Sequence, residues 1–381
     1  MSMQPHVIVL GLGVVGSSIA ATLASRGFPV TGVEQFSPLH ERGSSHGDTR
    51  IFRRVPHEGE IYVKMASTSL EGWCAWNRMA KDRLFVECGG IDAGPLESKL
   101  VQAAEELCEQ YEQPIEVLDG KEFNRRHSHY NLPLDWRVVY HPSSGFVRPD
   151  ATRTFLHGMA LERGAKLLHE TAVLGIEVTA NGVRLRTAQE TLTGDVLVVA
   201  AGSWLPKLLL DLSLSLSTER RVVAWFQPKA GAKFKDGELP IFCLDVDGGW
   251  YGMPTPDGRI KIGHDKHLRQ RIDPDEPPIE PDSADAAKLS TCIREYFIGF
   301  DAQPCEMKPC IYTLTQDHNF VIDRHPMHSN VLIFSCCSGH GFKYAPVYGE
   351  IAADLIAGQS RQELDLFRLG SVGDVVTRFS E

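Results

Sequence analysis

Several features that would assign this chain to a specialised class are missing. No uninterrupted apolar run reaches membrane-spanning length, so we expect no membrane partner. The nine cysteines show neither a C-x-x-C pair nor the spacing of a disulfide framework, which fits a reducing compartment. Basic residues are in the minority, with 39 Lys and Arg against 49 Asp and Glu and a net charge of −10. This balance disfavours nucleic acid as a partner, although a locally basic site can still bind an anion.

Residues 1–6 carry no basic leader and no small-residue cleavage site, and they lead directly into an apolar strand. We therefore expect a cytoplasmic protein. Its 381 residues, 43% of them apolar, are enough for a buried core and for more than one domain.

Apolar strands that run into small-residue turns appear at the start, in the middle and at the end of the chain. In the middle, one further strand is expected between those at 166–169 and 195–200. The pattern predicts an α/β fold of two domains, in which a discontinuous Rossmann-like domain is interrupted twice by a β-rich domain. The expected boundaries are 1–85, 150–215 and 318–381 for the first domain, and 86–149 and 216–317 for the second.

The first turn reads Gly11-Leu-Gly13-Val-Val-Gly16, between an apolar strand and a helix. Its glycines allow a tight turn, close approach of a pyrophosphate to the backbone, and close packing of helix on strand. Glu34 ends the next strand, where a carboxylate can accept hydrogen bonds from a ribose. The motif predicts a dinucleotide site and does not distinguish NAD from FAD. The alternative is a glycine turn without a ligand.

Residues 43–54 bring one imidazole, His46, and three guanidinium groups, Arg50, Arg53 and Arg54, next to a glycine-containing turn. Such a cluster can bind a carboxylate bidentately. If the segment from position 49 is extended, Arg50 and Arg54 share one side and Arg53 lies opposite. A solvated basic loop explains these residues equally well.

Two more stretches allow both a functional and an ordinary interpretation. Ser338-Gly-His-Gly-Phe-Lys343 opens the last helix, where glycines let the backbone approach a ring system; the alternative is a plain helix start with an exposed lysine. Lys261 alternates with apolar neighbours on a strand and matters only if its face lines a cavity. Cys310 opens another strand without a second thiol nearby, and a lone strand cysteine is most often structural.

Taken together and in this order, these stretches resemble the monomeric sarcosine oxidase family, which includes N-methyltryptophan oxidase and pipecolate oxidase. The resemblance runs over nearly the whole chain. Besides the segments above, the matching stretches are Ser-Gly-Phe-Val-Arg at 144–148, Ala-Gly-Ser-Trp at 201–204, Arg-Val-Val-Ala-Trp-Phe-Gln at 221–227, Tyr-Gly-Met-Pro at 251–254, Lys-Ile-Gly at 261–263 and Cys-Ile-Tyr-Thr at 310–313.

The resemblance implies FAD as the cofactor, bound by the Rossmann-like domain, with the substrate held by the β-rich domain. It also implies a thioether between the flavin 8α-methyl group and Cys310. The cofactor-binding residues that it implies are Gly11, Gly13, Val14, Val15, Gly16, Glu34, Ser45, Thr49, Val173, Ala201, Gly202, Trp204, Cys310, Gly339, Gly341, Phe342 and Lys343.

The resemblance further implies that Arg53 and Lys343 hold the substrate carboxylate. His46 and Arg50 would lie near the flavin ring and shape its electrostatics during substrate oxidation. Tyr251 would line the substrate pocket. Lys261 would lie beside the flavin, where its charge stabilises the negative charge that oxygen gains as it accepts electrons.

Two positions depart from the family pattern. Asp265 stands where the sarcosine and N-methyltryptophan members carry histidine, so a carboxylate at this substrate-binding position would repel an anion and could pair with an amine. Ser45 also replaces a histidine, which is compatible with the pipecolate branch.

The predicted function is FAD-dependent oxidation of a secondary amino acid such as sarcosine or N-methyltryptophan. Molecular oxygen would be the acceptor, an imine or aldehyde and hydrogen peroxide the products, and a monomer the active form. A pipecolate-type or other N-alkyl amino acid oxidase is the alternative. A nicotinamide-dependent dehydrogenase and a flavoprotein subunit of a larger assembly are the rivals from other classes.

Overall fold

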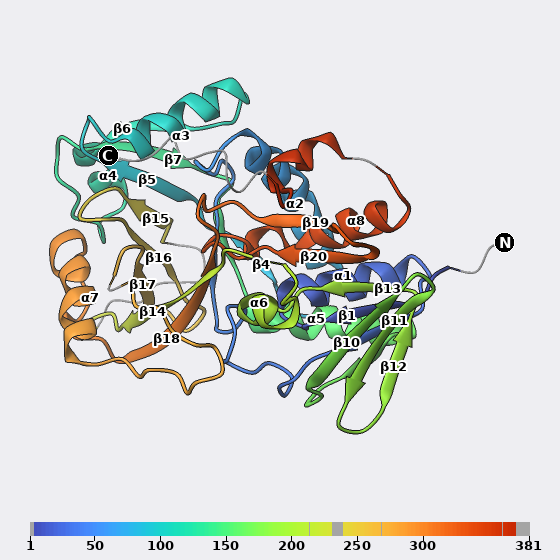
Figure 1. Cartoon of the computed structure of the whole chain (residues 1–381). Coiled ribbons are helices and arrows are strands. Elements are labelled where there is room, and N and C mark those ends of the chain that lie inside the picture. The colour runs from blue at the N-terminus through green and yellow to red at the C-terminus, as the bar shows by residue number, and fades with distance from the viewer. Residues whose placement is uncertain (1–3, 213, 231–238, 268, 360, 371–381) are drawn as a thin grey trace.

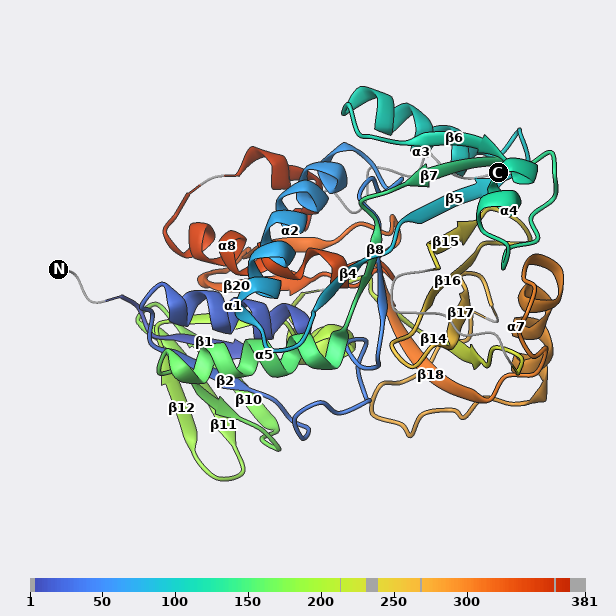
Figure 2. The ribbon, with the colours of Figure 1, turned by 180° about the vertical axis from the view of Figure 1, so that it is seen from behind.

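The computed structural model describes residues 4–212, 214–230, 239–267, 269–359 and 361–370. Two large β-sheets occupy opposite halves of the molecule (Figure 1), and the view from behind shows the same division (Figure 2). Between them a small sheet of order β3-β8-β4 links the halves. Its strands are β3 (Arg50–Phe52), β8 (Gly145–Val147) and β4 (Phe85–Glu87).

The first large sheet has six strands in the order β19-β20-β13-β1-β2-β9, all parallel to their neighbours except β19. Its central strands are continuous apolar runs because both faces of the sheet are covered. The strands are β1 (Val7–Leu10), β2 (Val30–Val33), β9 (Lys166–Leu168), β13 (Val196–Val199), β19 (Val321–His325) and β20 (His328–Ser335).

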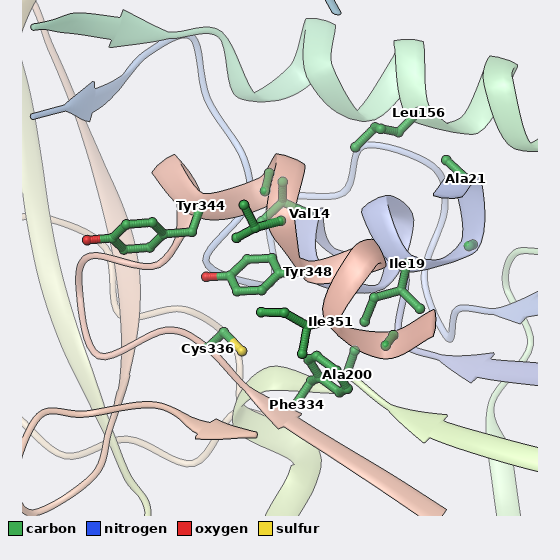
Figure 3. Close-up of a cluster of buried hydrophobic side chains, with 14 of the residues drawn as sticks. Val14, Ile19, Ala21, Leu156, Ala200, Phe334, Cys336, Tyr344, Tyr348 and Ile351 are labelled. Carbon is green, nitrogen blue, oxygen red and sulfur yellow. The ribbon is translucent and has the colours of Figure 1, made fainter. Parts of the chain in front are cut away.

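Helices cover one face of this sheet, and their apolar side chains meet the strands in a single core (Figure 3). Alternation along β1 directs Val7 and Val9 to this helical side and Ile8 and Leu10 to the other. The helices are α1 (Val14–Ser25), α2 (Glu60–Met79), α5 (Pro149–Glu162) and α8 (Ala345–Ile356).

A three-stranded antiparallel sheet covers the opposite face, and the sequence prediction of a single further strand in this region is wrong. Along these strands more buried side chains alternate with exposed ones, and short turns join the strands. Each strand therefore shows only a weak apolar pattern in the sequence. They are β10 (Val173–Thr179), β11 (Gly182–Thr187) and β12 (Thr191–Gly194).

The second large sheet has eight strands in the order β18-β14-β17-β16-β15-β5-β7-β6, antiparallel except where β15 meets β5. One face packs an apolar core against α7 (Ser283–Tyr296) and α4 (Gly120–Arg126). The strands are β5 (Gly90–Gly94), β6 (Glu116–Asp119), β7 (Arg137–His141), β14 (Ser217–Phe226), β15 (Ile241–Leu244), β16 (Trp250–Pro254), β17 (Ile260–His264) and β18 (Glu306–Leu314).

The remaining elements are short or peripheral: α3 (Lys99–Gln110), α6 (Leu205–Leu208), and three 3-10 helices at Gly202–Trp204, Phe342–Tyr344 and Gln362–Phe367. Within the described ranges, no helix combines the length and the hydropathy needed to cross a membrane. The predicted α/β class is confirmed, while the domain boundaries stay a prediction.

Two helical glycines give a matched test of this packing. A Cβ on Gly16 in α1 would come within 1.8 Å of the Gly11 carbonyl oxygen, whereas a Cβ on Gly158 in α5 would meet nothing within 4 Å. We expect Gly16→Ala to lower the free energy of unfolding by about 1–3 kcal/mol through overpacking. Gly158→Ala should raise it by about 0.5–1 kcal/mol through helix propensity. Urea unfolding of both variants checks this, and equal effects of the two would contradict the packing described.

Candidate active site

One cavity of about 1450 Å³ lies where the two large sheets face each other. On one side it is lined by residues at the carboxyl ends of β1, β2, β13 and β20, which is where ligands bind in open α/β sheets. On the other side it is lined by the polar face of the eight-stranded sheet, including Arg221, Tyr251, Lys261 and Cys310. Ordinary small-molecule pockets measure about 300–1,000 Å³, so this one has room for a dinucleotide and a second ligand.

The glycine turn after β1 forms the first end of the cavity. Gly11 has φ +94°, and a Cβ there would lie 2.6 Å from the Ala200 carbonyl oxygen, so the turn requires glycine at this position. Glu34 is buried, and its carboxylate accepts hydrogen bonds from the backbone N–H of Leu12 and Phe36 at 2.9 and 3.1 Å. Although burial raises the pKa of Glu34, His40 and these hydrogen bonds hold it below its usual value. An ionised acceptor at this end fits the ribose of a dinucleotide.

The segment after the turn contains buried polar atoms without partners. Thr49 Oγ1 lines the cavity, and neither it nor either ring nitrogen of His46 has a hydrogen-bond partner in the described part of the chain. Burial and the nearby charges of Arg50 and Lys261 lower the pKa of His46 to about 2, so its ring is neutral. Buried polar groups are rarely left unpaired. Thr49 Oγ1, which faces the cavity, therefore fits a bound polar group such as a flavin ring.

Two cations and a thiol converge next to this segment. The Lys261 ammonium is buried, donates to the Thr49 carbonyl at 2.9 Å, and lies 3.5 Å from an Asp48 carboxylate oxygen. Arg50 Nη2 lies 3.8 Å from Cys310 Sγ on β18, and both side chains line the cavity. Burial, reinforced by Arg50, lowers the pKa of Lys261 to about 8. This wall is thus positively charged, and its Lys261 ammonium is shielded from solvent.

A second pair of cations shares one carboxylate. Glu58 Oε1 lies 3.2 Å from Arg53 Nη2 and 3.4 Å from the Lys343 ammonium, and Arg53 also donates to Asp92 at 3.1 Å. Burial alone would raise the pKa of Glu58, but Lys343 and Arg53 hold it well below its usual value. Burial lowers the pKa of Lys343 to about 8. The two cations are placed to hold a carboxylate between them.

Tyrosine rings and a carboxylate face the same space. The Tyr312 hydroxyl on β18 donates to the Tyr251 hydroxyl on β16 at 3.2 Å. Asp265 follows β17 and is exposed to the cavity, and burial among the surrounding protein raises its pKa. This part of the cavity combines aromatic surface with a carboxylate.

The structure brings nearly all of the residues predicted from the sequence to this cavity. All of them line it except His46, which lies buried behind the wall, and Gly16, which packs against Gly11. The expected alternation along an extended segment 49–54 is wrong for Arg53. Because β3 ends at Phe52, the chain turns there, and Arg53 joins Arg50 in the cavity while Arg54 does not line it.

Several residues of the site were missed. Tyr312 has a detectable signal, because it shares a strand face with Cys310 two residues earlier. Asp92 has a weaker signal in the sequence, because it is the single acidic residue inside the buried strand β5. Glu58 lies in a loop after a basic segment, and only tertiary structure reveals that it joins Arg53 and Lys343.

Comparisons with known proteins agree with this geometry. The sequence model of the family described as FAD dependent oxidoreductase matches residues 6–355. The chain is 33% identical to a monomeric sarcosine oxidase of Bacillus sp. (strain B-0618), over 97% of this chain and 96% of the relative. It is 29% identical to an N-methyl-L-tryptophan oxidase of Salmonella heidelberg (strain SL476), over 96% and 99%.

Among solved structures, NikD, described as an unusual amino acid oxidase essential for nikkomycin biosynthesis, has the same fold. It superposes with a TM-score of 0.84 at 21% identity, covering 96% of this chain and 98% of NikD. The family resemblance predicted from the sequence motifs is confirmed, and a nicotinamide-dependent dehydrogenase is excluded as the class. The chain belongs to the FAD dependent oxidoreductase family, among relatives named monomeric sarcosine oxidase and N-methyl-L-tryptophan oxidase.

Proposed function

We propose that this protein is an FAD-dependent oxidase of N-methyl or other secondary amino acids. The observation that carries the proposal is the single cavity in which the glycine turn, Cys310 and the cation pair Arg53–Lys343 meet. The names of the relatives point to N-methyl amino acids as substrates. When bound, FAD would supply the redox chemistry by accepting a hydride from the carbon next to the amine nitrogen and passing its two electrons to oxygen, which becomes hydrogen peroxide. Water would hydrolyse the resulting imine to an aldehyde and an amine.

The carboxylate of the substrate would bind between Arg53 and Lys343. Glu58 already places one carboxylate oxygen within 3.4 Å of both cations, so the substrate carboxylate would compete for these partners. Charge-assisted hydrogen bonds to a carboxylate are about twice as strong as neutral ones. Arg53 and Lys343 would therefore fix the orientation of the substrate.

The same wall favours the reactive form of the substrate amine. An ammonium nitrogen has no lone pair with which to form the C=N bond as hydride leaves the neighbouring carbon, so the amine has to be neutral. The charges of Arg50 and Lys261 on this buried wall disfavour a further positive charge close to them, and His46, being neutral, adds no charge of its own. The amine would lose its proton on binding.

Lys261 would act on the oxygen side of the reaction. Its ammonium is fixed by the Thr49 carbonyl and lies 5.1 Å from the centre of the Trp225 ring. A preorganised charge in a water-poor site stabilises negative charge that develops on oxygen. We propose oxygen as the electron acceptor for this reason.

Cys310 would attach the cofactor covalently, through a thioether to the flavin 8α-methyl group. The Cys310 sulfur lines the cavity beside Arg50. Cys310 pairs with Arg221 on the neighbouring strand, on the side of the cavity opposite the glycine turn.

We further propose that the protein works as a monomer in the cytoplasm. The FAD-binding role would belong to residues 1–85, 150–215 and 318–381, and the substrate-binding role to residues 86–149 and 216–317.

A substrate panel tests the proposed function. The purified yellow protein should form hydrogen peroxide, one molecule per oxygen consumed, with at least one member of a panel of secondary amino acids. The panel contains sarcosine, N-methyl-L-tryptophan, pipecolate and N-methyl derivatives of larger amino acids, and the parent primary amino acids are the controls. Absence of peroxide with all secondary amines, or equal rates with the primary ones, would contradict the proposal.

The pKa of Lys343 predicts how carboxylate binding depends on pH. A carboxylate without an amine, such as 2-furoate, stays ionised above pH 6, whereas Lys343 loses its charge above about pH 8. The affinity should therefore be full below pH 8 and fall as the pH rises, towards the affinity of Lys343→Met. Titration of the flavin absorbance with 2-furoate from pH 6.5 to 9.5 measures this. Lys343→Arg should remove the fall; a fall that persists in this variant would assign the titration to another group.

A further inference from the structure

We propose that the substrate carries a second positive charge on its side chain and that Asp265 pairs with it. This inference rests on the proposed function and narrows it, from secondary amino acids in general to those with a basic side chain. The residues that carry it are Asp265, Tyr251 and Tyr312, together with the carboxylate anchors Arg53 and Lys343.

Strand geometry directs Asp265 into the cavity. Lys261, Gly263 and Asp265 alternate on one face of β17 and its continuation, and Lys261 and Asp265 both line the cavity. The neighbouring strand β16 places Tyr251 opposite Gly263. Next to it, a Cβ on Gly249 would lie 3.3 Å from Asp265 Oδ2, so a glycine leaves space for the carboxylate. The carboxylate is part of the built wall of the cavity.

Two other carboxylates of this wall are already neutralised. Glu58 pairs with Arg53 and Lys343, and Glu219 pairs with Arg221 at 2.8 Å. Asp265 differs from them, because within the described ranges it has neither an ion pair nor a hydrogen bond to its side chain. Its side chain is exposed to the cavity, so water solvates it while the cavity is open. A ligand that fills the cavity displaces this water, and the carboxylate then requires a cation or hydrogen-bond donors from the ligand.

Burial raises the pKa of Asp265, and Arg53 and Arg221 are the cations that oppose this rise most strongly. Arg53 already pairs with Glu58 and Asp92, and Arg221 is engaged elsewhere too. Its guanidinium donates to Glu219 and to the Arg220 carbonyl instead, and it lies 4.9 Å from the centre of the Tyr312 ring. The Asp265 carboxylate is left for a cation that enters the cavity.

The surroundings of Asp265 fit a cation better than a neutral donor. Tyr251, Tyr312 and Asp265 all line the cavity. Burial raises the pKa of both tyrosines, and the charge of Asp265 raises it further. Aromatic faces attract ammonium and guanidinium groups, and most strongly where water is excluded. A carboxylate flanked by two tyrosines is thus a suitable site for an alkylammonium or a guanidinium.

The reacting amine itself is a poor partner for Asp265. A carboxylate next to that nitrogen would stabilise its protonated form, whereas the oxidation requires the neutral amine. The cation recognised by Asp265 is therefore a different group of the substrate. An amino acid whose carboxylate binds Arg53 and Lys343, and whose side chain ends in an amine or a guanidinium, supplies both charges. Nα-methyl derivatives of lysine, ornithine and arginine belong to this class.

Matched substrates and variants test the inference. Nα-methyl-L-lysine and N-methyl-L-norleucine have side chains of nearly the same length and differ in the terminal charge. The FAD-loaded protein should show kcat/KM at least about tenfold higher for the lysine derivative, which corresponds to about 1.4 kcal/mol. Asp265→Asn keeps the shape, removes the charge, and should reduce this ratio about tenfold or more. Asp317→Asn removes the same charge elsewhere on the cavity wall and should leave the ratio within about twofold.

The outcomes separate this inference from the function on which it rests. Equal kcat/KM for the two substrates, or an equal loss for both in Asp265→Asn, would overturn the role of Asp265 and leave the oxidase function standing. If no secondary amine yields peroxide, binding still tests the site. In that case 6-aminohexanoate should raise the Tm of the FAD-loaded protein more than hexanoate does, and Asp265→Asn should remove the difference. Equal Tm shifts in the unchanged protein would overturn the inference.

Discussion

The site depends on one constraint, which is that the carboxyl edge of the parallel sheet and the polar face of the eight-stranded sheet enclose the same cavity. The first contributes the glycine turn and Glu34, and the second contributes Cys310 and Lys261. Neither surface forms a complete site alone. The small sheet β3-β8-β4 holds the two halves together, and β3 continues directly into Arg53, so the link between the halves also delivers a cation to the cavity.

Charge balance across this cavity explains why so many ionisable groups are buried in an acidic protein. Arg53, Lys261 and Lys343 are almost inaccessible, and burial of unpaired cations costs several kcal/mol each. Asp48, Asp92 and Glu58 compensate them only in part, because each cation keeps an approach from the cavity. The wall therefore attracts an anion at Arg53 and Lys343, and by our proposal it attracts a cation at Asp265. Opposite charges at two positions of one cavity orient a ligand that carries both.

The sequence predicts those parts of the site that rest on local rules. Gly11 and Gly16 follow from a strand, a turn and a helix in sequence, and Cys310 and Lys261 follow from strand alternation together with the family resemblance. Glu58 could not be predicted, because its role arises only when loop 53–59 meets the 3-10 helix Phe342–Tyr344. The three strands of the sheet β10–β12 could not be predicted one by one, because β10 and β12 bury none of their side chains completely and lack the continuous apolar run of the parallel strands. Asp265 was noticed as a departure from the family, but its lack of a partner became visible only in three dimensions.

The central claim is that one FAD spans the cavity from the glycine turn to β18. Acid precipitation of the yellow protein, followed by digestion and mass spectrometry of the peptides, tests it most directly. We expect a pellet that keeps its colour and one flavin-bearing peptide, which contains Cys310, whereas the pellet of a Cys310→Ala protein should be colourless. Pigment found entirely in the supernatant, or attached to a peptide from outside the cavity wall, would contradict it.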